Sequence, residues 1–401
     1  MEKNDEIVRK KNRRFNRIIS MVVGVSFGIY IVSSPNKAYL DSARFLYQMF
    51  CFFIMFYIGQ NIHIVVHELG HLCFGLLTGY RFLAIALRNI IFVKEKGKLK
   101  IHLTKNGSAG GFCMMQAPEL KNGSMPFVLF ECGGILANAC LSIIFLILLL
   151  YNKENSNLLL IYFSFVISGI VIVVMNGMPR KTISLFTDGY NLRSLLNSSK
   201  AVCCFWMQTQ INSQTISGVR LRDMPDEWFA FSMEDDFSNN VIATIVTTTC
   251  SRLIDQQLFS EASQLMEQVL DMEMNITEMT RHYLICECLF VEIIGANRSE
   301  VIDEIFDQEQ ESFMKSMKNS PAILRTVYAY VLLVEDNLAE AKRLREMFDR
   351  KSATYHYQMV YDGEKELFNI VDQIYQERKL LTEGERNNVI ESDGGETKIV
   401  Y

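Results

Sequence analysis

The sequence predicts an α-helical polytopic membrane protein with about four transmembrane helices, followed by an acidic all-α domain. Two observations predict this fold class: four long runs lack any charged residue, and the two halves of the 401-residue chain differ in charge. Residues 1–200 carry 22 Lys/Arg and 10 Asp/Glu, a net charge of +12, whereas residues 201–401 carry 18 and 35, a net charge of −17. The basic charge lies beside apolar runs and the acidic half would repel phosphate, so we exclude a nucleic-acid partner.

The charge-free runs are 19 to 25 residues long and cover 18–36, 45–67, 132–152 and 155–179. Each can cross a hydrocarbon core of about 30 Å, which takes a helix of about 20 residues. Buried core helices of a soluble protein are the alternative, but four such runs leave too little polar surface for a soluble fold. We therefore predict transmembrane spans at about 18–36, 45–79, 126–150 and 156–178.

The distribution of Lys and Arg predicts the orientation of these spans. Seven basic residues in segment 1–17 place the N-terminus in the cytoplasm, and segments 81–105 and 180–200 are also basic, unlike loops 37–44 and 151–157. We expect a multi-pass protein of the cell membrane with both termini cytoplasmic. A cleaved signal peptide is a rival explanation of the first run. An uncleaved anchor is favoured because proline and asparagine follow where small residues would mark a cleavage site.

A metal-binding pattern lies at the end of the second run, where residues 67–71 read HELGH. His67 and His71 are four residues apart, so on a helix they share one face and can bind one metal ion, and zinc takes nitrogen ligands readily. Glu68 can accept a proton from a water that the metal activates. Ionisable residues inside an apolar helix are costly unless they have a function. A catalytic site is favoured over a structural one.

Asp188 is the candidate for a third ligand, which a zinc hydrolase needs beside an open fourth position. It is the only carboxylate between Glu154 and Asp223, and it follows Pro179 at the end of the fourth run. The alternative is that Asp188 is the N-cap of a helix over 190–196. The two roles can coexist.

At this point the sequence resembles the site-2 protease family of intramembrane zinc metalloproteases, over about residues 45–198. Two departures from the family pattern are a longer loop at 180–187 and Ile135 in place of a proline. The motifs that carry the resemblance are HELGH at 67–71, Ala-Gly-Gly-Phe at 109–112, Gly-Ile-Leu-Ala-Asn at 134–138, and Asn-Gly-Met-Pro at 176–179 with Asp188-Gly189.

The resemblance implies a metalloendopeptidase. His67, His71 and Asp188 would bind one Zn²⁺ per chain, and Glu68 would be the general base. The substrate would be a peptide bond in a small membrane-spanning protein or peptide precursor.

The resemblance also implies that Asn176, Gly110 and Gly111 contact the substrate and that Asn138 packs and forms hydrogen bonds near the site. His63 lies four residues before His67 on the same helix face. It could tune the site or shuttle a proton as part of a second layer with Asn138, or it could simply pack beside the cavity.

Residues 81–116 predict a small membrane-associated β-segment. Segments 82–92 and 99–103 are apolar and partly alternating, and turns are expected at Gly97 and at 106–107. The edge of such a segment could bind a substrate strand through main-chain hydrogen bonds.

The acidic half predicts an all-helical cytoplasmic domain over 199–380 and a mobile polar tail over 381–401. Residues 258–265 resemble 337–344, an offset of 79 residues that suggests tetratricopeptide-like repeats. An ordinary helical domain is the alternative. Either form could bind a cytoplasmic protein partner.

Four other polar residues are not expected to take part in catalysis. Glu131 heads the third span and is expected at the membrane interface, with a polar role near the cavity as the alternative. His102, His282 and His356 have no neighbouring ligand pattern and are expected on the surface.

The favoured function is therefore an intramembrane zinc protease. The first alternative is a non-catalytic membrane scaffold with a structural metal and a partner-binding helical domain, which has no need for Glu68. The second is a metal transporter or sensor, but only one plausible metal site is visible and the sequence lacks a chain of intramembrane carboxylates that could form a pathway.

Overall fold

The computed structural model describes residues 2–33, 41–95, 97–103, 110–152, 155–272, 274–352 and 358–393. It divides into two compact units, which we call the membrane unit and the helical unit. The membrane unit is Met1–Thr249 with Met272–Thr280, and the helical unit is Cys250–Asp271 with Arg281–Tyr401. We predicted a boundary at residue 199, but the first unit extends 50 residues further along the chain.

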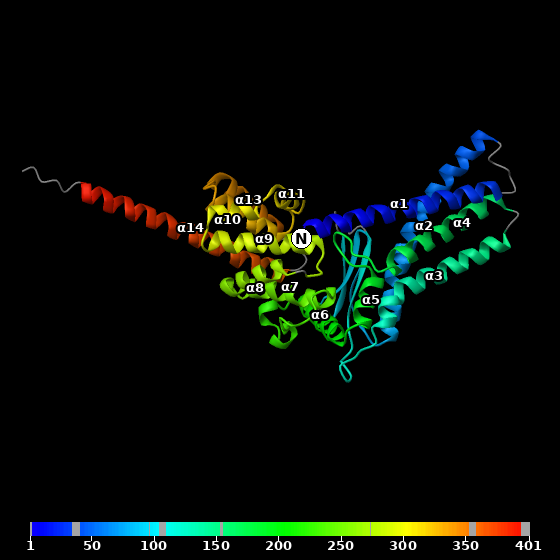
Figure 1. The fold of residues 1–401 in the computed structure, drawn as a ribbon, viewed down its shortest axis with the longest axis horizontal. Coiled ribbons are helices and arrows are strands. Elements are labelled where there is room, and N and C mark those ends of the chain that lie inside the picture. The colour runs from blue at the N-terminus through cyan, green and yellow to red at the C-terminus, as the bar shows by residue number, and fades with distance from the viewer. Residues whose placement is uncertain are drawn as a thin grey trace, which may run out of the picture. The chain divides into compact units, whose positions relative to one another are not determined.

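Four helices of the membrane unit are long and apolar enough to cross a membrane, which confirms the predicted number. Their spanning segments are Glu6–Ser33, Ser42–Leu77, Val128–Tyr151 and Asn157–Gly177. They belong to α1 (Glu2–Ser33), α2 (Ser42–Leu77), α3 (Val128–Tyr151) and α4 (Ser156–Gly177). α2, α3 and α4 pack against one another (Figure 1). Large apolar side chains of α1, α2 and α3 are exposed, as expected for surfaces in contact with lipid: Met21, Phe50, Ile143 and Leu150.

The backbones of α2 and α3 meet at a pair of glycines. A Cβ atom added to Gly70 would lie 2.4 Å from the carbonyl oxygen of Gly133, and one added to Gly133 would lie 2.8 Å from the carbonyl oxygen of Gly70. Small residues at such a crossing let membrane helices approach closely. This contact presses the HELGH segment of α2 against the start of α3.

We expect Gly133→Ala to lower the thermal stability of the purified full-length chain in detergent. The added methyl group meets backbone that cannot move aside, so the loss should be about 1–3 kcal/mol, as for other overpacked sites. Gly28→Ala in α1 is the matched control, because a Cβ there meets nothing within 4 Å. Equal melting temperatures for the two variants would contradict this account of the crossing.

A four-stranded antiparallel sheet connects α2 to α3. Its strands are β1 (Arg81–Leu87), β2 (Ile90–Glu95), β3 (Lys98–Leu103) and β4 (Gly111–Gln116), in the order β3-β2-β1-β4. Gly97 makes the turn between β2 and β3 with φ +79°, and the turn expected at 106–107 lies outside the described residues. β1 and β4 contact α2, so the edge strand β4 lies beside the HELGH helix.

After α4, the chain makes a loop at 180–187 and continues as α5 (Asp188–Leu196) and α6 (Ser199–Ser217). α6 is bonded to the end of β4: Gln116 Nε2 donates to Gln210 Oε1 at 2.7 Å, and the Trp206 indole donates to the Pro118 carbonyl at 3.0 Å. These bonds explain why the membrane unit extends beyond residue 199. Two short 3₁₀ turns, Leu221–Asp223 and Asp226–Phe229, precede α7 (Asn240–Asp255).

The basic N-terminal part of α1 packs against the 180–187 loop and the first residue of α9 (Glu278–Ile294). Arg9 donates to both carboxylate oxygens of Glu278, at 2.5 and 2.9 Å, and Asn12 donates to the Lys181 carbonyl at 3.0 Å. The Arg180 guanidinium lies over the Phe15 ring, 3.8 Å from its centroid. The first helix therefore helps to hold the loop that leads to Asp188.

The core of the helical unit contains a fully buried cation, Arg325. Arg325 is fully buried, donates to Glu287 at 2.7 Å, pairs with Glu364 at 3.4 Å and lies over the Phe290 ring. The helices that contribute residues to this unit include α8 (Phe259–Asp271), α9 (Glu278–Ile294), α10 (Ser299–Ile305), α11 (Gln308–Ser316), α12 (Pro321–Leu333), α13 (Leu338–Ser352) and α14 (Gln358–Asp393).

One sequence-based expectation for this unit needs correction. His282 was expected on the surface but is only 5% exposed, because its Nδ1 bonds to Gln310 at 2.7 Å and its ring stacks on Phe313. α14 continues to Asp393, into the segment 381–401 that we predict to be a mobile tail, in a stretch rich in helix-forming residues, and the mobility of that tail stays a prediction. The two repeat segments begin α8 and α13, and the repeat architecture stays a prediction.

Candidate metal centre

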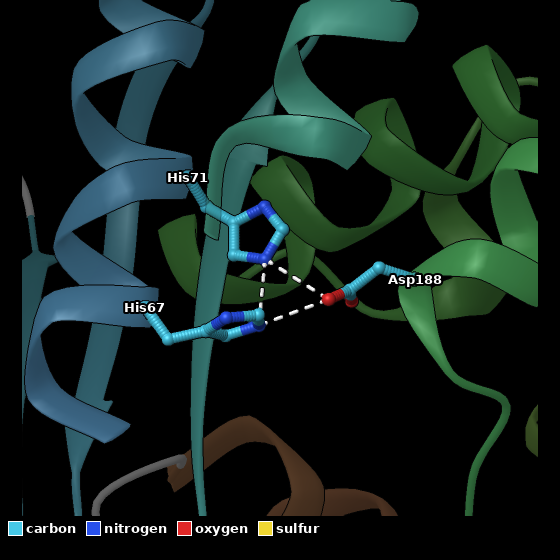
Figure 2. A group of neighbouring side chains, drawn as sticks. All are labelled: His67, His71 and Asp188. Atoms are coloured by element: carbon cyan, nitrogen blue, oxygen red, sulfur yellow. Dashed lines mark hydrogen bonds and ion pairs between the residues drawn. The ribbon is translucent and has the colours of Figure 1, made fainter. Parts of the chain in front are cut away.

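Three side chains from two helices converge on one point. α2 presents His67 and His71 from successive turns, and Asp188 comes from the first turn of α5 (Figure 2). His67 Nε2 lies 2.9 Å from Asp188 Oδ2, His71 Nε2 lies 3.5 Å from the same oxygen, and the two Nε2 atoms are 3.2 Å apart. Two imidazole nitrogens and one carboxylate oxygen form the kind of donor set that tetrahedral metal sites use.

The outer nitrogen of His71 supports this interpretation. His71 Nδ1 is 2.7 Å from the carbonyl oxygen of Phe130, which can only accept, so Nδ1 carries the proton. The Nε2 atom of a neutral His71 then presents a lone pair to the centre. Burial alone would raise the pKa of the Asp188 carboxyl, but its contacts with the two histidines hold that pKa below its usual range, so the carboxylate is ionised. The donors therefore fit a divalent cation.

The 180–187 loop folds back on itself, so its extra length does not displace Asp188. The Thr187 hydroxyl donates to the Met178 carbonyl at 2.8 Å and accepts from the Arg180 amide at 3.0 Å. Gly189 lets α5 approach the end of α4, because a Cβ there would lie 2.0 Å from the Gly177 carbonyl oxygen. The N-cap of α5 is Thr187, not Asp188, so the Asp188 carboxylate faces the histidines instead of capping the helix.

The three donors open onto a cavity of ≈ 370 Å³ that also holds the other central candidates. Glu68 lies against β4, because a Cβ added to Gly111 would be 2.9 Å from Glu68 Oε1. Gly110, Gly111 and Asn176 line the cavity together with Glu68. The structure thus brings the residues implied for metal, base and substrate to one place.

His63 and Asn138 lie behind the cavity, and both are fully buried. Asn138 bridges two histidines: its Oδ1 is 3.0 Å from His63 Nδ1 and its Nδ2 is 3.2 Å from His67 Nδ1. His63 Nε2 is 3.1 Å from the Phe165 carbonyl oxygen. Asn138 therefore links His63 to His67.

Sequence reasoning underestimated two cavity residues. Glu131 was expected at the interface, but it is only 4% exposed and lines the cavity, because the Gly70–Gly133 crossing draws the start of α3 against α2. The signal that identified Asp188, an isolated carboxylate beside an apolar run, applies equally to Glu131. Cys113 on β4 also lines the cavity, but burial and the charge of Glu68 raise the pKa of its thiol to about 12, so it stays protonated.

Comparison with known proteins agrees with this geometry. Neither the curated proteins nor the solved structures gave a match to the chain. The model of peptidase family M50 matches residues 53–377, which include the HELGH segment, Asp188 and much of the helical unit. The resemblance seen in four motifs is confirmed and extends well beyond residue 198. The chain therefore belongs to peptidase family M50, the site-2 protease family of membrane metalloproteases.

Proposed function

We propose that the chain is an intramembrane zinc metalloprotease that hydrolyses a peptide bond in a small membrane-spanning protein or peptide precursor. One observation carries the proposal. The converging donors of His67, His71 and Asp188 share a cavity with the carboxylate of Glu68, between an apolar helix and an edge strand. A structural metal site has no need for such a base or for an open cavity.

Each protein group has a defined task in this reaction. His67, His71 and Asp188 would hold one Zn²⁺, which when bound lowers the pKa of water and polarises a carbonyl group. Glu68 accepts the proton of the attacking water on its carboxylate and then donates it to the leaving amide nitrogen, as a general base and acid. Glu68 is only 7% exposed, so this transfer takes place in a largely buried setting.

The substrate segment would lie extended along β4. A helical substrate hides its peptide bonds, whereas an extended segment can pair with an edge strand through main-chain hydrogen bonds. Gly110 and Gly111 at the start of β4 line the cavity, and Asn176 faces it from the end of α4. These positions support contact with the substrate backbone on either side of the scissile bond.

The charge distribution supports a multi-pass location in the cell membrane with both termini cytoplasmic. HELGH follows about 25 residues of α2, roughly 38 Å of helix at 1.5 Å per residue. We place the reaction near the cytoplasmic side. Because the C-terminal half would also lie in the cytoplasm, the helical unit would be available to bind a cytoplasmic protein partner.

The proposal is tested by comparing the wild type with Glu68→Ala and Glu68→Gln in the native cell. Membrane-derived and secreted peptides would be profiled by mass spectrometry, and zinc would be measured per purified chain. We expect specific cleavage products to disappear in both variants while zinc stays near one per chain. If the peptides are unchanged while zinc is still bound, the protease proposal is wrong and the result favours a non-catalytic membrane scaffold.

A further inference from the structure

Four polar groups form a continuous chain behind the metal centre. In order they are the Phe165 carbonyl of α4, the His63 imidazole, the Asn138 amide of α3 and the His67 imidazole. The contacts between them measure 3.1, 3.0 and 3.2 Å, and His63 and Asn138 are fully buried. Buried polar groups without water must satisfy one another, so the proton positions along this chain are linked.

The Phe165 carbonyl sets the direction of the chain because it can only accept. His63 must therefore carry a proton on Nε2 to bond to it. A neutral His63 then has a bare Nδ1, which accepts and requires the NH₂ group of Asn138. The amide oxygen of Asn138 is left facing His67, whose Nδ1 must carry the proton. His67 Nε2 is then a free lone pair, the form that a metal ligand needs.

We infer that Asn138 is a positioning residue: anchored by His63, its amide oxygen accepts from His67 Nδ1 and fixes the tautomer and ring orientation that bind zinc. His71 receives the same support from the main-chain carbonyl of Phe130. The two histidine ligands are thus oriented by different means, one by backbone and one by a side-chain relay. This inference rests on the proposed zinc site.

The structure shows the amide turned the other way, with Nδ2 toward His67 and Oδ1 toward His63. In that orientation His67 carries its proton on Nε2 and donates to Asp188 Oδ2 at 2.9 Å, and His63 needs a proton on both ring nitrogens because each faces an oxygen, a buried charge that the half-turn removes. The two ends of an amide have nearly the same shape, so a half-turn of the group exchanges them without moving either ring. The half-turn gives His67 Nδ1 an acceptor, which favours the tautomer with its proton on Nδ1 and a lone pair on Nε2.

A packing role for Asn138 predicts different behaviour from a hydrogen-bonding role. Leucine has a similar size and suits an apolar helix crossing, whereas aspartate buries a charge. If Asn138 only fills space, Asn138→Leu should bind zinc as the wild type does and Asn138→Asp should be disruptive. If its oxygen orients His67, aspartate keeps the acceptor and leucine removes it.

The test measures zinc affinity of the purified full-length chain in detergent, by competition with a chromogenic chelator. We expect Asn138→Leu to bind zinc 10- to 100-fold more weakly, the usual effect of removing a partner of a ligating histidine. Asn138→Asp should bind zinc at least tenfold more tightly than Asn138→Leu. The reverse order of affinity, or wild-type affinity in Asn138→Leu, would overturn the inference.

The part played by His63 is measured by a double-mutant cycle. His63→Leu should weaken zinc binding, and His63→Leu with Asn138→Leu should bind no more weakly than Asn138→Leu alone, because the two residues act in series. Additive losses would show that His63 does not act through Asn138. Melting temperatures recorded with zinc removed reveal any general loss of folding in each variant.

One further variant separates failure of this inference from failure of the proposed function. His67→Ala should lose the high-affinity zinc. If the wild type binds no zinc, or His67→Ala binds it equally well, the proposed zinc protease itself is wrong. If His67→Ala loses zinc and Asn138→Leu does not, only the relay is wrong.

Discussion

Asp188→Asn is expected to remove the metal from the site while leaving the cavity in place. The substitution keeps the shape of the side chain but replaces an anionic oxygen, 2.9 Å from His67 Nε2 and 3.5 Å from His71 Nε2, with a neutral amide. Losing an outer partner of a ligand weakens metal binding 10- to 100-fold. Loss of a direct ligand should therefore weaken zinc binding by more than about 100-fold. Zinc per chain after dialysis against a weak chelator measures the effect.

Glu131→Gln is the matched control for Asp188→Asn. Glu131 is another buried carboxylate that lines the same cavity, but it is not one of the three converging donors identified in the described part of the chain. Its substitution removes one negative charge from the same surroundings. We expect Glu131→Gln to retain its zinc. An equal loss of zinc in both variants would show that the charge of the cavity, rather than coordination by Asp188, holds the metal.

Much of the membrane unit could be predicted because two simple geometric rules determine where its spans and its histidine ligands lie. Hydrocarbon thickness fixes the length of a charge-free span, and the 3.6-residue period of a helix puts His67 and His71 on one face. Asp188 could be found because it stands alone in a long stretch without carboxylates. None of these signals depends on knowing which helices touch.

The features that sequence reasoning missed depend on contacts between distant segments. The burial of Glu131 follows from the crossing of α2 and α3 at Gly70 and Gly133, and the boundary beyond residue 199 follows from bonds between α6 and the end of β4. His282 is buried by Gln310, which lies 28 residues away. A single sequence gives the polarity of each segment, but not which polar group meets which.

Gly111→Ala is expected to abolish most proteolysis while the metal remains bound. The added Cβ would lie 2.6 Å from the Ala86 carbonyl oxygen and 2.6 Å from Glu68 Cγ. The carbonyl belongs to the paired strand β1 and cannot move far, so the Glu68 side chain must give way. Displacing a general base should lower the rate of hydrolysis by about 10²–10⁴-fold. The rate is measured with the substrate peptide identified by the Glu68 comparison.

Two further variants show whether Gly111 acts through Glu68. Gly110→Ala should keep far more activity than Gly111→Ala, because a Cβ at the neighbouring position meets nothing within 4 Å although both glycines line the cavity. Gly111→Ala combined with Glu68→Gln should be no slower than Glu68→Gln alone, since a base that is already absent cannot be displaced. If the losses multiply instead, Gly111 serves the reaction by another route, such as direct contact with the substrate backbone. Equal activity in the two alanine variants would show that the space beside Glu68 does not govern the reaction.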